Sequence, residues 1–262
     1  RPFPFWGADH LAYHDALSRA AFLVASVVLL FHQSREFLIV SLRGFWDYLG
    51  HSSYGKWVAH LGLVVVGTGL FIYFKASTPL LGDGQLYLTE LETVPGWDRV
   101  DNAPLSFWFL RRLHSLGASP NLTFQIYSYA GGALFLILSV FAARALGENR
   151  VSRFVVLGFL LTGGFLQLFF GYVENYALLF PAILFFVLCS CRCLEGRLPI
   201  WVAAGFLGCI IPLHFSLGSF APCLLVLAGL TSSRMGWRAW AGLVAAPVCA
   251  LVVLTLIGFD LV

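Results

Sequence analysis

The chain has 262 residues, of which 59% are hydrophobic and only 11% are charged, and its mean hydropathy is +0.84. Because soluble domains are nearer a quarter charged, this chain has too little polar surface to coat a water-soluble globule, and lipid must cover much of it. The formal net charge is +3, and no basic tract with interleaved aromatic residues occurs, which excludes a nucleic-acid-binding surface of the usual kind.

The first apolar segment lies within residues 17–42. It contains an apolar stretch from Ala20 to Phe31, followed by the polar run 32–36. This pattern fits either a membrane span or an amphipathic element at the membrane interface. We therefore treat residues 1–56 as an N-terminal segment that precedes a transmembrane module at 57–262. The chain opens at Arg1 without a methionine, which fits a fragment or a processed product.

Seven later segments are apolar and are predicted to cross the membrane. A crossing helix needs about 20 mostly apolar residues. Pro212 interrupts the long apolar stretch between 199 and 230, and proline removes a backbone donor, so we expect two short helices there; one kinked helix is the alternative. The expected fold class is all-α, a polytopic transmembrane helical bundle with some short or broken spans. The predicted spans are 57–76, 120–143, 153–170, 172–191, 199–211, 213–230 and 238–258.

The one long polar interval, residues 77–119, is predicted to contain two short helices. Residues 80–91 carry apolar side chains at spacings typical of a short amphipathic helix. Pro104 opens the second helix at a position in the first turn that proline favours. Tryptophan and phenylalanine in 105–113 suit the depth of the lipid headgroups. We expect two interfacial helices in this outer loop.

The arginines indicate the orientation. Every alternate link between predicted spans is basic, as the positive-inside rule expects of cytoplasmic loops, whereas the turns near 171–175 and 211–215 contain neither lysine nor arginine. The expected location is therefore a bacterial inner membrane, with the basic links cytoplasmic and residues 77–119 periplasmic. The basic links are 144–153 (Arg144, Arg150, Arg153), 192–197 (Arg192, Arg197) and 231–238 (Arg234, Arg238).

Acidic, amide and histidine side chains from distant parts of the chain fall at the outer ends of these spans. Ionisable groups at a bilayer are costly and usually mark a function. The candidate residues are Asp83, Asp101, Arg111, Arg112, Glu174, Asn175 and His214.

Each of these residues also has a structural interpretation. Asp83 can cap a helix, although its glycine neighbours would let a substrate approach closely. Glu174 can be a solvated or capping residue of an outer turn, and His214 can satisfy a carbonyl freed by the break at Pro212. Arg111 and Arg112 can reach toward lipid phosphates.

The six cysteines lie in or at the ends of apolar segments, where a small hydrophobic residue is ordinary. Cys189, Cys191 and Cys193 alternate along one segment, and this spacing on a helix spreads the thiols around it. No histidine accompanies them. We therefore predict no metal site here, and a divalent cofactor has no support in the sequence.

The chain resembles the GT-C superfamily of integral membrane glycosyltransferases, in particular the protein O-mannosyltransferases and the lipid A aminoarabinose transferase. In that family an acid–aromatic signature opens the first outer loop, and a Pro-Leu-aromatic stretch begins the second interfacial helix. Here the stretch 82–87 (Gly-Asp-Gly-Gln-Leu-Tyr) takes the first place and 102–108 (Asn-Ala-Pro-Leu-Ser-Phe-Trp) the second. The turn 171–176, followed by a helix containing histidine, is similar to uncharacterised bacterial members. The resemblance covers roughly residues 57–230.

The resemblance implies inverting transfer of a sugar from a polyprenyl-phosphate carrier to an acceptor hydroxyl outside the membrane. Asp83 matches the position of the family's catalytic base, and arginines would neutralise the departing phosphate. The implied substrate-binding residues are Gln85, Tyr87, Asp101, Arg111, Arg112, Glu174, Asn175 and His214. The implied partners are membrane lipid and the lipid-linked sugar donor.

Two other functions remain open. The family's first loop often has two adjacent acids, whereas here Asp83 stands between two glycines, and many members are twice this long. A non-catalytic membrane subunit of a larger complex would fit both departures. A transporter is the second alternative, because broken helices and ionisable groups recur in that class. The acids lie at the outer face instead of mid-membrane, however, and the sequence has no inverted repeat.

Overall fold

The computed structural model describes residues 16–37, 40, 53–76, 83–93 and 102–259, and every regular element in these ranges is a helix. The chain divides into two compact units, residues 1–59 and 60–262. The boundary between these units, at residues 59 and 60, lies within helix α4 (Ser53–Tyr73). The predicted boundary between 56 and 57 lies within the same helix. The expectation of an all-α fold is confirmed for the described part of the chain.

The first unit contains α2 (Ala16–Leu30), which has 15 residues. A helix of that length is shorter than the roughly 20 residues needed to cross the hydrocarbon layer. Its large apolar side chains are exposed, among them Leu17, Leu30 and Val24. The segment is thus helical over 16–30 and 32–37, as expected, and much of its apolar surface is exposed.

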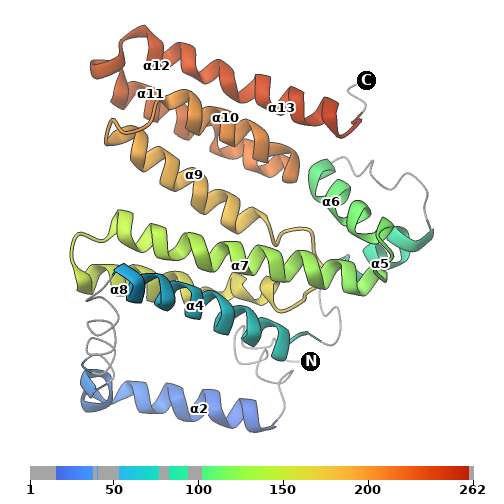
Figure 1. Cartoon of the computed structure of the whole chain (residues 1–262), viewed down its shortest axis with the longest axis vertical. Helices are drawn as coiled ribbons and strands as arrows, with labels where there is room; N and C mark the ends of the chain where they lie inside the picture. The colour runs from blue at the N-terminus through green and yellow to red at the C-terminus, as the bar shows by residue number, and fades with distance from the viewer. Residues whose placement is uncertain (1–15, 38–39, 41–52, 77–82, 94–101, 260–262) are drawn as a thin grey trace, which may run out of the picture. The chain divides into compact units, whose positions relative to one another are not determined.

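The second unit contains the end of α4 and all later helices, and its first two helices after α4 are short. α5 (Gly84–Thr93) and α6 (Pro104–Ser115) fall in the predicted outer loop, where two helices were expected. Pro104 stands in the first turn of α6, as predicted. Both helices pack against α7 (Pro120–Leu146), the long central helix, as Figure 1 shows.

α7 begins at Pro120 because the Ser119 hydroxyl accepts a hydrogen bond from the Leu122 N–H (3.4 Å) and proline fits the first turn. α8 (Arg150–Leu161) begins with a reciprocal capping box between Asn149 and Ser152. α8 and α9 (Leu179–Leu194) both pack on α7. The first hydrophobic core lies between these helices and contains Phe107, Phe124, Phe135 and Phe169 among other residues.

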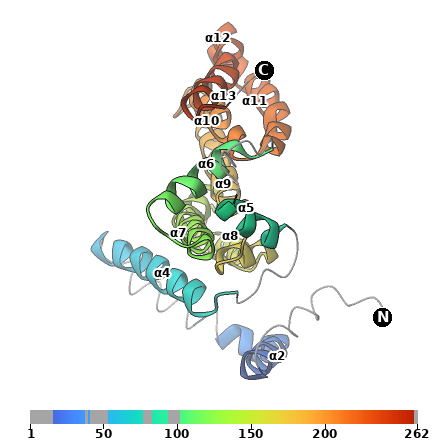
Figure 2. The same cartoon turned by 90° about the vertical axis from the view of Figure 1, so that its right-hand side faces the viewer.

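The C-terminal helices form a second core. α10 (Ile200–Ile210) packs against α9, α11 (Ala221–Met235) and α13 (Ala245–Leu256), and Figures 1 and 2 show α10, α11 and α13 side by side. Gly208 allows the close approach of α10 and α13, because a Cβ there would lie 2.1 Å from the Ala246 carbonyl oxygen. The short elements η3 (Ile211–Leu213), η4 (Phe215–Phe220), α12 (Trp237–Ala241) and η5 (Gly242–Val244) join these helices.

Three described helices are long and apolar enough to cross a membrane: Pro120–Leu146, Phe215–Met235 and Trp237–Leu256. Three shorter apolar helices cover Trp57–Tyr73, Leu179–Leu194 and Ile200–Leu213. The predicted bundle of seven spans is therefore not confirmed. The break at Pro212 is confirmed, since α10 ends at Ile210 and His214 has extended backbone angles (φ −164°, ψ 126°).

Two predicted spans are wrong in extent. The α-helix in the predicted span 153–170 ends at Leu161, and the 3-10 helix η2 (Gly164–Phe169) begins at the second of two consecutive glycines, 163 and 164. The span 172–191 becomes helical only at Leu179. Gly171 adopts φ +73°, a conformation that ends regular helix, so residues 171–178 form an irregular segment instead.

Candidate functional site

The irregular segment 171–178 is fastened to its neighbours by backbone and hydroxyl groups. The Gly171 N–H donates to Ser128 Oγ of α7 (2.9 Å), and Ser128 Oγ donates to the Leu168 carbonyl (2.6 Å). The Ala76 N–H, just beyond α4, donates to the Phe170 carbonyl (2.7 Å). Although it is not helical, this segment therefore has a defined position at one end of α7.

A buried hydroxyl network joins this segment to three other elements of the second unit. The Tyr127 hydroxyl donates to Ser106 Oγ (2.8 Å) and also lies 3.2 Å from the Asn175 carbonyl oxygen. Ser106 Oγ in turn donates to the Leu213 carbonyl (2.8 Å), which stands at the break before His214. α6, α7, the segment 171–178 and η3 thus meet around one set of buried polar atoms.

Asn175 is fully buried, with 0% of its surface exposed. Within the described part of the chain, neither the oxygen nor the nitrogen of its side-chain amide has a hydrogen-bond partner. Buried polar groups are nearly always paired, so an unpaired amide calls for an explanation such as a water or a ligand group. Its position next to Glu174 makes it a candidate for substrate contact, as the sequence predicts.

The acidity of the Glu174 carboxyl group is strongly shifted. Burial, and then the charge of Asp83, raise the pKa of Glu174 to about 7, while a hydrogen bond from the Asn175 backbone N–H acts in the opposite direction. A carboxyl group with this pKa can hold or release a proton near neutral pH. The structure therefore brings Asp83 and Glu174, which are far apart in the sequence, within electrostatic reach of each other.

Two tyrosines belong to the same cluster. Burial raises the pKa of Tyr87 to about 12, and the charges of Glu174 and Asp83 add to the shift. The pKa of Tyr176 is raised by burial and then by the same two carboxylates. The Tyr87 ring is nearly buried and contacts Phe107 of α6 (ring centroids 5.3 Å apart). Tyr87 was predicted from the sequence, whereas Tyr176 was not.

His214 joins the cluster through Tyr176, whose ring centroid lies 5.3 Å from that of the imidazole. His214 Nδ1 accepts hydrogen bonds from the Ser216 N–H (3.2 Å) and the Ser216 hydroxyl (2.7 Å). A backbone N–H can only donate, so the neutral ring carries its proton on Nε2. Burial lowers the pKa of His214, which also favours the neutral form. His214 can thus offer a single donor, Nε2–H, to a substrate oxygen.

Asp83 lies immediately before α5, and its backbone carbonyl accepts a hydrogen bond from the Tyr87 N–H (2.9 Å). Its side chain is exposed, as is that of Gln85. Asp83 therefore starts the helix with its backbone, and its carboxylate stays accessible.

The two predicted arginines of α6 have different surroundings. Arg112 is exposed, and its guanidinium lies 5.3 Å from the centre of the Trp108 ring, a cation–π contact within its own helix. Arg111 is half-buried. In the described part of the chain, neither arginine is among the groups that shift the pKa of Glu174, and Asp101 lies outside the described residues.

Sequence reasoning missed the residues that position the site: Ser106, Tyr127, Tyr176 and Ser216. A hydroxyl inside an otherwise apolar helix is the only signal that Ser106 and Tyr127 offer in the sequence. Serine and tyrosine are common in such helices, so this signal does not single out these two.

No group of three or more histidine, cysteine, aspartate or glutamate side chains in the described ranges is arranged to hold a metal ion. The described cysteines are free thiols, including Cys189, Cys191 and Cys193 along α9. The chemistry that can be assigned is therefore that of the acid pair, the tyrosines and the imidazole.

No protein-family model matches this chain, and no curated protein or solved structure matches it either. Function is consequently inferred from the chain's own residues and their arrangement.

Proposed function

We propose that this chain is a membrane glycosyltransferase module of the GT-C type. It transfers a sugar, with inversion, from a polyprenyl-phosphate donor to an acceptor hydroxyl at the outer membrane face. The observation that carries the proposal is the electrostatic interaction between Asp83 and Glu174, which also reaches Tyr176, together with the contact between Tyr176 and His214. A transferase of this kind needs a proton acceptor and neutral hydrogen-bonding groups close together.

In the proposed reaction, the acceptor oxygen attacks the anomeric carbon of the sugar as its proton passes to the Asp83 carboxylate. The bond between the anomeric carbon and the phosphate oxygen breaks, and the phosphate leaves with the electron pair. The exposure of Asp83 supports this role, because a base must reach the incoming hydroxyl. Arg111 and Arg112 are proposed to neutralise the departing phosphate.

Glu174, Asn175 and His214 are proposed to hold the sugar or the acceptor. Glu174, with a pKa of about 7, is protonated in part at neutral pH and can donate a hydrogen bond. His214 offers Nε2–H, and the amide of Asn175 has both donor and acceptor capacity to spare. Gln85, Tyr87 and Asp101 complete the proposed substrate-binding set.

The proposed setting is a bacterial inner membrane, with the arginine-rich links cytoplasmic and residues 77–119 periplasmic. Seven crossing segments remain part of the proposal, with α5 and α6 lying on the outer leaflet. Three helices of crossing length support a membrane location. The alternation of basic and uncharged links along the sequence supports the orientation.

The direct test is Asp83→Asn in the full chain, assayed for release of polyprenyl phosphate from a panel of synthetic polyprenyl-phosphate sugars. Loss of the base should lower the rate by roughly 10²–10⁴-fold while the protein still folds and inserts. Glu92→Gln is the matched control, because Glu92 is an exposed acid of α5, the helix that Asp83 immediately precedes, and this variant should transfer at the wild-type rate.

Equal rates for Asp83→Asn and wild type would remove Asp83 from the mechanism. A wild-type chain that is folded and inserted, yet turns over none of the donors, would favour the non-catalytic subunit instead.

A further inference from the structure

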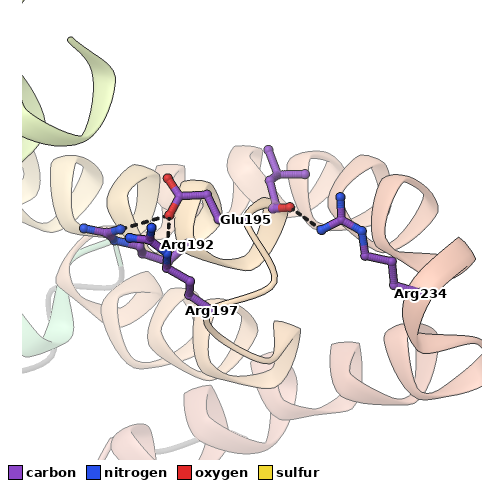
Figure 3. A network of polar contacts seen from close by, with 5 residues as sticks. Arg192, Glu195, Arg197 and Arg234 are labelled. Carbon is purple, nitrogen blue, oxygen red and sulfur yellow. Dashed lines mark hydrogen bonds and ion pairs between the residues drawn. The ribbon is translucent and has the colours of Figure 1, made fainter. Parts of the chain in front are cut away.

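The C-terminal end of α9 carries a compact ion network, shown in Figure 3. Glu195 Oε2 accepts a hydrogen bond from Arg192 Nη1 (2.9 Å) and forms an ion pair with Arg197 Nε (3.3 Å). Gly196 adopts φ +73°, and the N–H groups of Arg197 and Leu198 both donate to the Arg192 carbonyl (2.9 and 3.1 Å). This turn closes the helix and holds two guanidinium groups around one carboxylate.

A third guanidinium reaches the same turn from α11. Arg234 Nη1 donates to the Leu194 carbonyl (2.9 Å), as Figure 3 also shows. A Cβ placed on Gly196 would lie 3.4 Å from this nitrogen, so Arg234 passes close over the turn. Arg192 of α9, Arg197 of the link after α9 and Arg234 of α11 therefore converge on this turn.

Positive charge exceeds negative charge at this turn. Glu195 is the only acid between residues 190 and 242, whereas Arg192, Arg197, Arg234 and Arg238 all lie in that stretch. The side chains of Arg192 and Arg197 are 41% and 66% exposed. Each guanidinium has five N–H donors, and the contacts above use only part of them. The cluster thus presents unused donors and an excess of positive charge to its surroundings.

Two exposed tryptophans flank the arginines in the sequence, Trp201 after Arg197 and Trp237 after Arg234. Trp201 is 58% exposed in the first turn of α10, and Trp237 is 74% exposed at the start of α12. A Cβ on Gly242 would lie 3.3 Å from the Trp201 backbone nitrogen, so the segment after α12 packs against the start of α10. Tryptophan favours the depth of the lipid headgroups, and the helices that leave this end are apolar.

We infer that this arginine turn, defined by Arg192, Glu195, Arg197 and Arg234, binds the phosphate of an anionic phospholipid headgroup. The planar guanidinium fork matches phosphate oxygens, and the excess positive charge favours an anion. The flanking tryptophans indicate a phosphate at headgroup depth and not one free in water. This site shares no residue with the proposed transferase site, so each can fail without the other.

The test uses the full chain purified in detergent and mixed with phosphatidylglycerol or with phosphatidylcholine, and bound lipid is measured by native mass spectrometry. Phosphatidylglycerol should bind preferentially. Arg197→Gln and Arg192→Gln should each weaken its binding about fivefold, the effect of one basic residue near an anionic lipid surface. Lys75→Gln is the control, because it removes an exposed positive charge beside the segment 170–178 instead, and it should bind as wild type does.

Glu195→Gln separates a lipid site from a purely structural network. Removing the one carboxylate leaves the arginines without their counter-charge, so phosphatidylglycerol should bind several-fold more tightly. If the arginines serve only to pair with Glu195 and to cap α9, this variant will melt earlier and bind lipid no better than wild type, which would overturn the inference. Displacement of the lipid by equimolar inorganic phosphate would also overturn it, since the site would then be one for a soluble anion.

Discussion

At the scale of single residues, Glu174 connects stability with pH. Its pKa in the folded chain is raised from 4.5 to about 7, so between these values the folded state binds more protons than the unfolded state. Stability then falls as the pH rises through this window. The stabilisation is complete below about pH 4.5 and lost above about pH 7.

Glu174→Gln should remove this dependence, because glutamine does not titrate. We expect the melting temperature of the wild-type chain in detergent to fall from about pH 4.5 to about pH 7 and that of Glu174→Gln to change less across the same range. Thermal unfolding followed by circular dichroism measures both. Parallel curves for the two proteins would show that Glu174 titrates normally.

Asp83, Glu174 and His214 could be predicted from the sequence, because ionisable residues stand out in so apolar a chain. The burial of Asn175 and the approach of Tyr176 to His214 could not be predicted. Both depend on where the segment 171–178 lies against α6 and α7, which no local pattern encodes. The tautomer of His214 likewise depends on the hydrogen bond from the Ser216 N–H.

At the scale of elements, glycines determine how closely helices approach the site. A Cβ on Gly131 of α7 would lie 2.6 Å from the Ala177 carbonyl oxygen, which is a backbone atom that cannot move alone. Gly131→Ala should therefore push the segment 171–178 away from α7. We expect a loss of about 1–3 kcal/mol in the free energy of unfolding and a lower transfer rate.

Gly229→Ala is the matched control, since Gly229 also lies within a helix and a Cβ there would meet no atom within 4 Å. Its stability should equal that of wild type or rise slightly. Chemical denaturation in detergent measures the free energy of unfolding of both variants. Equal values for the two would contradict the close approach of α7 to Ala177.

The break between α10 and α11 could be predicted because Pro212 has a local effect on the backbone. The turn near 171–175 could be predicted, whereas the predicted start of the next span at 172 is wrong, because residues 172–178 are largely apolar and aromatic but irregular. Gly171 and the hydrogen bonds to Ser128 and Ala76 decide the shape of the segment 171–178. Ala76 is far from this segment in the sequence, so no local pattern indicates the contact.

At the scale of the whole molecule, hydropathy predicted an all-helical membrane chain, and the described residues agree. The number of spans could not be predicted in the same way. Composition shows only that a segment is apolar, whereas glycines and turns decide whether it forms one helix of crossing length. Three described helices meet that condition.

The proposed orientation places two serines on opposite sides of the membrane. Ser115 ends α6 and Ser233 lies near the end of α11, and both are exposed. In a cysteine-free background, Ser115→Cys should react with a membrane-impermeant maleimide added to intact cells, and Ser233→Cys should react only after permeabilisation. Labelling of both from the same side would refute the proposed topology.

The juxtaposition of Asp83 and Glu174 can be measured by titrating the Glu174 carboxyl group, through infrared difference spectroscopy, in wild type and in Asp83→Asn. The structure predicts a pKa of about 7 in wild type and a lower one in Asp83→Asn, because the neighbouring charge is gone while the burial remains. An identical pKa in the two proteins would contradict a shared site.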